Sequence, residues 1–199
     1  MQLTSTNNPI GLIYALKKFF IVKIMKIKKS KKLSLNIIYP YSFYRDSRGI
    51  YTETFNKKKW FKKFKLNFVE EDSVISKKNV FRGIHGDSKT WKLVSCTSGK
   101  VLSIIINLDK KSKQFGLSEK FILHNSNFQI LIPPNYGNSY LVISDSATYN
   151  YKQTKYYSGA KNQFTYNILD PFFKIKLPTK NLNISKRDKS ADFINKISK

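Results

Sequence analysis

Apolar and polar residues follow one another in short runs from Leu33 onward, and few stretches show the three-to-four-residue spacing of a helix. Runs rich in Ile, Val, Tyr, Thr and Phe predict strands at residues 35–43, 49–55, 101–108, 128–134, 140–145 and 147–154. Turn-forming sequences separate these runs: DSRG at 46–49, TSGK at 97–100, DKKSKQFG at 109–116 and NYGN at 135–138. The pattern predicts a mainly β, antiparallel sandwich or barrel.

One stretch departs from the strand pattern. Residues 56–65 space Trp60, Phe61 and Phe64 as a short amphipathic helix would. We therefore expect one or two short helices beside the sheet.

Residues 1–32 differ from the rest because they mix apolar residues with lysines and contain no acid. The apolar stretch is interrupted by Lys17 and Lys18, is too short to span a bilayer, and lacks the small-residue cleavage site of a secretory signal. A basic amphipathic helix on a membrane surface is one interpretation, but an extension outside the folded part is favoured. We expect a poorly ordered leader over residues 1–32 and a single domain over residues 33–199.

Composition narrows the choice of partners. With 199 residues the chain can bury one core, and its 15% aromatic content argues against disorder. A net charge of +25 would suit nucleic acid or an anionic membrane. However, the charge is nearly all lysine spread along the chain, whereas nucleic-acid-binding proteins concentrate arginine beside exposed aromatics. We therefore expect no specific nucleic-acid partner.

Cysteine and histidine are scarce. The single cysteine, Cys96, excludes an intrachain disulfide and fits a reducing cytoplasm, and its apolar surroundings indicate a buried, unreactive thiol. Two histidines, His85 and His124, are few for a metal site. No glycine-rich loop follows a predicted strand, so a dinucleotide cofactor is not expected. We expect neither metal nor cofactor.

Two polar tracts carry candidate chemistry, NVFRGIHGDSKTWKL at residues 79–93 and YKQTKYY at residues 151–157. Strand alternation would place Arg82 and His85 on opposite faces unless a bulge intervenes, and Lys92 should fall on the next strand. An imidazole beside a carboxylate is a competent base near neutral pH, and arginine offers a planar fork to phosphate. Together the tracts suggest chemistry on a phosphate-bearing small molecule.

Each of these residues also has an ordinary structural explanation. A lone histidine on a strand is more often structural than catalytic, and strand tyrosines usually pack with a wet hydroxyl. Gly83 and Gly86, on either side of His85, would let another group approach the backbone closely.

Residues from about 35 to 188 resemble the dTDP-4-dehydrorhamnose 3,5-epimerase family of nucleotide-sugar enzymes. The matching tracts occur in the family's order: DSRGIYTETFN, KKNVFRGIHGD, WKLVSCTSGKV, INLDKKSKQFG, QILIPP, LVISDSATYNYKQTKYYS and SKRD. The resemblance implies a cupin-type jelly roll, a homodimer, a nucleotide-sugar substrate and no cofactor. It also implies epimerisation at C3, C5 or both of a 4-keto-6-deoxy sugar, within deoxysugar and surface polysaccharide biosynthesis.

The resemblance implies a role for each matching residue. His85 would be the base, Asp188 the carboxylate that orients it, Lys92 the cation facing the developing oxyanion, and Tyr151 the acid on the opposite face. Among the residues that would contact the substrate, Arg82 would bind the diphosphate and Arg48 would reach the ligand of the neighbouring subunit. The full set of substrate-contacting residues is Arg48, Glu53, Glu70, Asp72, Arg82, Lys92, Asn138, Tyr157 and Arg187.

Several positions depart from the family pattern. Asn138 stands where the family usually has a second active-site histidine, and Ser103 replaces a usual acid. Gly86 and Asp87 follow the histidine in place of an aromatic and a glutamine. These changes spare the base, its carboxylate, the lysine and the tyrosine but alter the wall near the sugar. The carbon that is epimerised, the sugar and the nucleotide base therefore stay open.

Two other functions are compatible with the sequence. A ketoisomerase of similar fold would use related proton chemistry, and the presence of Tyr151 favours epimerisation over it. A basic binding protein without enzymatic activity would bind nucleic acid with a steep dependence on salt. Retention of all four catalytic candidates makes this the least favoured class.

Overall fold

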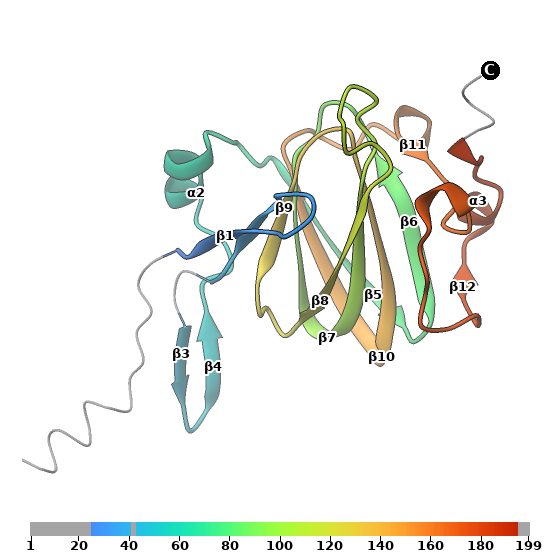
Figure 1. Cartoon of the computed structure of the whole chain (residues 1–199). Coiled ribbons are helices and arrows are strands. Elements are labelled where there is room, and N and C mark those ends of the chain that lie inside the picture. The colour runs from blue at the N-terminus through green and yellow to red at the C-terminus, as the bar shows by residue number, and fades with distance from the viewer. Residues whose placement is uncertain (1–24, 41–42, 195–199) are drawn as a thin grey trace, which may run out of the picture.

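Antiparallel strands make up most of the regular structure in the computed structural model, which describes residues 25–40 and 43–194 (Figure 1). The strands are β1 Ile27–Lys29, β2 Asn36–Ile38, β3 Phe43–Asp46, β4 Gly49–Thr52, β5 Glu70–Lys77, β6 Val80–Gly86, β7 Lys92–Asn107, β8 Ser118–His124, β9 Gln129–Ile132, β10 Tyr136–Gln153, β11 Phe164–Thr165 and β12 Asn183–Ile184. The helices are α2 Lys57–Phe64 and α3 Lys186–Lys189, with 3-10 turns at Ala160–Asn162 and Pro171–Phe173. The mainly β fold with short helices is as predicted.

Two long strands, β7 and β10, organise the sheet. They pair from Tyr136 opposite Asn107 to Gln153 opposite Lys92, within a sheet ordered β1-β2-β9-β7-β10-β6-β11. The sequence predicted separate strands at 140–145 and 147–154 and a turn at 97–100. The structure instead keeps β7 and β10 continuous and absorbs the turn residues in register shifts, because a bulge can bend a strand without ending it.

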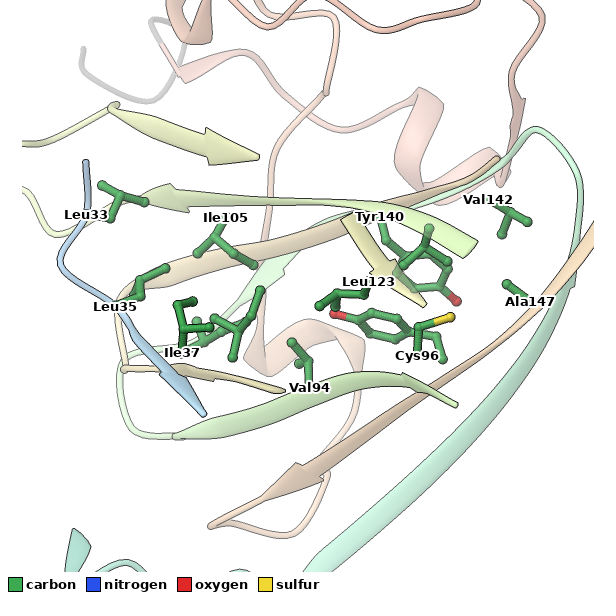
Figure 2. Packing of buried hydrophobic residues seen from close by; sticks show 14 residues of the cluster. Leu33, Leu35, Ile37, Val94, Cys96, Ile105, Leu123, Tyr140, Val142 and Ala147 are labelled. Atoms are coloured by element: carbon green, nitrogen blue, oxygen red, sulfur yellow. The ribbon is translucent and has the colours of Figure 1, made fainter. Parts of the chain in front are cut away.

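The principal core lies inside the curved sheet. Residues of β2, β7, β8, β9 and β10 point into it, including Ile37, Val94, Ile105 and Leu123 (Figure 2). Strand β9 buries all of its residues, and β7 buries residues 92–96 and 101–107, because both faces are covered there. This explains why they read as continuous apolar runs, as strands buried on both faces do.

A second cluster covers the other side of β6, β7 and β10. Tyr166, Ile168, Phe173 and Ile194, from the C-terminal segment, pack against residues such as Ile104. The C-terminal segment thereby lies along β6, where β12 pairs in parallel and α3 follows it (Figure 1). This packing brings the residues of α3 next to β6.

The predicted helix at residues 56–65 is present as α2. Asn56 caps it by accepting a hydrogen bond from the Lys59 backbone N–H at 3.2 Å. Trp60 is buried against the sheet with Leu93 and Leu131. The helix ends at Lys65, which adopts the left-handed conformation.

Part of the expected leader pairs with the sheet. Residues 1–24 lie outside the described part, but β1 pairs with β2, before the expected domain boundary at residue 33. Glu119 of β8 secures this segment: its carboxylate accepts from the Ser30 hydroxyl at 2.6 Å and from the Leu33 N–H at 2.9 Å. No helix in the described residues has the length and apolar character needed to cross a membrane.

The hairpin β3–β4 extends away from the main sheet (Figure 1). Its two strands pair with each other as a separate two-stranded sheet. Ile50 and Tyr51 of the hairpin are 54% and 65% exposed. A two-stranded ribbon of this kind is marginally stable by itself, so its exposed side chains are suited to contact another surface.

Candidate active site

A cavity of about 220 Å³ opens on the face formed by β6, β7 and β10. Its lining combines cations, hydroxyls and amides from distant parts of the chain: Val74, Arg82, His85, Lys92, Asn138, Tyr140, Tyr149, Tyr151, Gln153, Tyr157, Gln163 and Arg187. The cavity therefore brings together the two polar tracts singled out in the sequence.

His85 and Asp188 form the central hydrogen-bonded pair of the site. The Asp188 carboxylate, 4% exposed, lies 2.7 Å from His85 Nε2 and also accepts the Gly83 N–H at 3.3 Å. Burial would raise the pKa of Asp188, but the hydrogen bond and charge of His85, with the Gly83 and Ser185 contacts, lower it overall. An ionised carboxylate can only accept, so Nε2 donates to it and Nδ1 is left as the basic nitrogen.

Lys92, the first residue of β7, brings a buried ammonium group to the cavity. Burial lowers the pKa of Lys92, and the positive charge of Arg187 lowers it further. The negative charges of Asp87 and Asp72 raise this pKa and offset part of the decrease. A charged amine with little water around it interacts strongly with a neighbouring oxyanion.

Tyr151 lies near the C-terminal end of β10 and is half-buried. Its cross-strand partners are Val94 on β7 and Asp72 on β5. Burial raises the pKa of Tyr151 to about 12, and the nearby carboxylates of Asp72 and Glu70 contribute. The phenol therefore stays protonated and is suited to donate a proton.

Two arginines also line the cavity. Arg187 of α3 donates to the Thr165 hydroxyl at 2.6 Å, and the exposed Arg82 donates to Ser76 Oγ at 3.3 Å. Simple alternation would have put Arg82 and His85 on opposite faces of the strand. Both reach the cavity because the β6–β10 register shifts between Asn138 and Tyr140, the bulge that the sequence left open.

The glycines beside His85 let other groups approach the backbone closely, as the sequence predicted, and those groups belong to the same chain. A Cβ on Gly83 would lie 2.5 Å from the Ser139 Cβ, and one on Gly86 would meet the ring of Phe164. Both glycines thus allow neighbouring segments of the same chain to pack closely.

Asn138 lies directly opposite His85 in the β6–β10 register. Its Oδ1 accepts a hydrogen bond from the Tyr149 hydroxyl at 3.0 Å. Burial raises the pKa of Tyr149, so the phenol remains the donor. This contact fixes the amide orientation and leaves Nδ2 for another acceptor. Ser103 of β7, the other departure from the family pattern, is fully buried.

The remaining sequence candidates lie at different distances from the cavity. Tyr157 lines it and also a neighbouring polar cavity of about 500 Å³. Glu70 and Asp72 both accept hydrogen bonds from Gln153 Nε2. Arg48 pairs with Asp46 in the β3–β4 hairpin, and Glu53 pairs with Lys59.

Sequence reasoning missed Gln153, Tyr149 and Gln163. Gln153 lies in the YKQTKYY tract, but its role depends on carboxylates more than eighty positions earlier. Tyr149 lies two residues before Tyr151, and this spacing on a strand is a signal for a shared face. No local signal marks Gln163, which follows a 3-10 turn.

Among residues 25–40 and 43–194, no group of three or more His, Cys, Asp and Glu could hold a metal ion. Cys96 is buried, and burial raises the pKa of its thiol to about 11.

Comparison with known proteins identifies related sequences. Residues 32–196 match the family model described as dTDP-4-dehydrorhamnose 3,5-epimerase. The chain is 36% identical over 118 residues to the protein of that name from Escherichia coli K12, covering 56% of this chain and 64% of the relative. It is 30% identical over 160 residues to that from Shigella flexneri, covering 76% and 87%.

A solved structure is similar in fold as well. The dTDP-6-deoxy-D-glucose-3,5-epimerase of Legionella pneumophila, in complex with dTDP-4-keto-L-rhamnose, superposes with a TM-score of 0.80 at 31% identity. The match covers 86% of this chain and 94% of that structure. The sheet described above is therefore a cupin-like β-sandwich.

Proposed function

Because this chain belongs to the dTDP-4-dehydrorhamnose 3,5-epimerase family, we propose that it epimerises a nucleotide-linked 4-keto-6-deoxy sugar at C3, C5 or both. The observation that carries the proposal is the His85–Asp188 pair at 2.7 Å, whose histidine lines one cavity with Lys92 and Tyr151. This set supplies a base, an oxyanion cation and an acid, the three groups that the reaction requires.

Each residue has a defined step. The C4 carbonyl acidifies the neighbouring C–H bonds, and His85 removes one proton while Asp188 stabilises the imidazolium. The electron pair moves onto the C4 oxygen, where Lys92 stabilises the enolate. Tyr151 then gives its proton to carbon from the other face, which inverts the centre. The proton on His85 returns to solvent and Tyr151 takes one up.

The basic side of the cavity suits a diphosphate. Arg82 and Arg187 both line it, and guanidinium groups bind phosphate oxygens through paired hydrogen bonds. The relative from Legionella contains dTDP-4-keto-L-rhamnose, which supports a nucleotide-sugar ligand here. We assign Asn138 and Tyr157 to contacts with the sugar and nucleotide portions of this ligand.

We also expect the reaction to take place in the cytoplasm, because the free thiol of Cys96 suits a reducing compartment.

A solvent-exchange experiment tests the reaction. The protein is incubated in heavy water with dTDP-4-keto-6-deoxyglucose and, separately, with a GDP-linked 4-keto sugar, and NMR follows C3 and C5. Deuterium with inversion at both carbons means a double epimerase, and deuterium at one carbon means a single-site enzyme. Movement of the carbonyl would indicate a ketoisomerase, and no incorporation with either substrate would refute the epimerase assignment.

We further propose a homodimer in which the β3–β4 hairpin reaches the neighbouring subunit. The hairpin pairs only with itself among the described strands, exposes Ile50 and Tyr51, and carries Arg48, which is absent from the described lining of its own cavity. The arrangement would place Arg48 at the partner's diphosphate.

Complementation tests this sharing. Arg48→Ala and His85→Asn subunits are each expected to be inactive, but a heterodimer has one site with both residues intact. Equal, fully exchanged mixtures should therefore regain about a quarter of wild-type activity, because half of the dimers are mixed and half of their sites are complete. No recovery in a mixture shown to contain heterodimers would contradict the shared site.

A further inference from the structure

Gln153, at the C-terminal end of β10, joins two carboxylates through one amide. Its side chain is 3% exposed, and its Nε2 donates to Glu70 Oε1 at 3.0 Å and to Asp72 Oδ2 at 3.3 Å. We call these three residues the Gln153 cluster. Glu70 and Asp72 lie on the same face of β5, two positions apart, so the amide separates and fixes two carboxylates that would otherwise repel each other.

Asp72 of this cluster faces two catalytic groups. It is the direct cross-strand partner of Tyr151, and directly opposed residues bring their Cβ atoms to within about 5.5 Å. Its charge also acts on Lys92, the cross-strand partner of Gln153 on β7. The other charged groups around Lys92 are Asp87 and Arg187. Asp72 is thus placed directly beside the acid, and its charge reaches the oxyanion cation across β10.

Glu70 connects the cluster to the loop after β10. Its second oxygen, Oε2, accepts the backbone N–H of Tyr157 at 2.9 Å, and Tyr157 lines the catalytic cavity. The Gln153 cluster therefore fixes β5, the end of β10 and the following loop relative to one another.

We propose that Asp72, held by Gln153, is a positioning residue that keeps the Tyr151 hydroxyl in place as the proton donor of the reaction. The inference rests on the epimerase function proposed above. Asp72 acts through Tyr151 and leaves proton removal by His85 intact. Its loss should therefore separate two events that normally occur together, exchange of the carbon-bound proton and inversion of the carbon.

The experiment compares Asp72→Asn, Gln153→Met and wild type in heavy water. Both substitutions nearly preserve side-chain shape; the first removes the charge and the second removes the bridging amide. Inversion should fall about 10- to 100-fold, less than the roughly 10²–10⁴-fold that a general acid contributes, because Tyr151 itself is still present. Exchange should fall less than about threefold, because deuterated His85 can return its deuteron to the same face. Equal loss of exchange and inversion, or no loss of either, would overturn the inference.

Two controls make the result specific. Glu71→Gln removes the same charge from the same strand, but Glu71 pairs with Lys152 and is half exposed, so the ratio of exchange to inversion should not change. In a Tyr151→Phe background, Asp72→Asn should have no further effect on the ratio. A further loss there would show that Asp72 acts on the substrate directly and would overturn the positioning role.

Failure of the proposed function gives a different result. Wild-type protein that neither exchanges nor inverts any 4-keto sugar would overturn the epimerase assignment together with this inference. Active wild type with an unchanged ratio in both Asp72→Asn and Gln153→Met would overturn the inference alone.

Discussion

Replacing Asp188 with asparagine tests the proposed base directly. The substitution keeps the shape of a side chain that is 4% exposed and lies 2.7 Å from His85 Nε2. It removes a hydrogen bond between charged partners, worth about 1.5–3 kcal/mol, when the imidazolium forms. Because each 1.36 kcal/mol corresponds to about a tenfold change in rate, proton removal should slow by roughly 10- to 150-fold.

The assay is the initial rate of deuterium incorporation from heavy water, measured with thermal unfolding to confirm the fold. The asparagine can still accept the Gly83 N–H that Asp188 accepts at 3.3 Å, so a large loss of stability is not expected. Lys189→Gln, an exposed change in the same helix, serves as a control with unchanged rate. A folded Asp188→Asn protein with a rate within threefold of wild type would refute the reasoning.

Three other predictions follow from single contacts. Glu119→Ala should lower the free energy of unfolding by about 2–4 kcal/mol, because the backbone N–H groups of residues 31–33 lose their acceptor. Urea unfolding measures this free energy, and a decrease of less than about 0.5 kcal/mol would contradict the prediction. The pKa of Asp188 is lowered, so its contribution to stability is present above the unfolded pKa of about 3.9 and is lost as the pH falls through the folded pKa. When stability is measured against acid pH, Asp188→Asn should lack the part of the stability loss that Asp188 causes. An acid profile identical to that of wild type would contradict this prediction. Burial lowers the pKa of Lys92. As the pH rises, activity should therefore be lost at a pH below the usual lysine pKa of about 10.4. The activity of Lys92→Arg should show no such loss, and an unchanged loss at high pH would assign the titration to another group.

Local patterns predicted many of the elements but not their connections. The spacing of Trp60 and Phe64 predicted α2, and β-branched runs predicted several strands but missed β5 and β8. The turn signal at 97–100 was misleading because Gly99, with a φ of 73°, bends β7 without ending its pairing with β10. A bulge and a turn use the same residue types, so sequence alone does not separate them.

The candidate site shows the same division. Periodicity alone leaves His85 ambiguous, and its partner Asp188 is 103 positions away; the family resemblance connected them before the fold did. Gln153 went unnoticed because its two acceptors lie on another strand. A buried amide has meaning only when its partners are known, and those partners are set by the register of β5 against β10.

Asn138, which lies opposite His85, limits how C3 and C5 of the sugar can be epimerised. Asn138 does not titrate, and its amide is fixed by Tyr149 at 3.0 Å. It can hold a hydroxyl or carbonyl group but cannot take a proton from carbon. Since His85 is the one histidine in the described lining, proton removal has a single imidazole base. C3 and C5 lie on either side of C4, so a double epimerase must reposition the ring between the two events.

Tyr149→Phe tests whether the fixed amide guides this repositioning. The substitution removes the hydrogen bond to Asn138 and retains the ring that stacks on Tyr140 at 4.1 Å. Once freed, the amide can rotate and offer either its oxygen or its nitrogen to the sugar. We therefore expect the ratio of deuterium incorporation at C3 and C5 to change by about threefold, which corresponds to about 0.65 kcal/mol and lies within the roughly 0.5–1.5 kcal/mol that one hydrogen bond contributes. NMR time courses measure both carbons at once, and an unchanged ratio would show that Asn138 does not guide the choice between them.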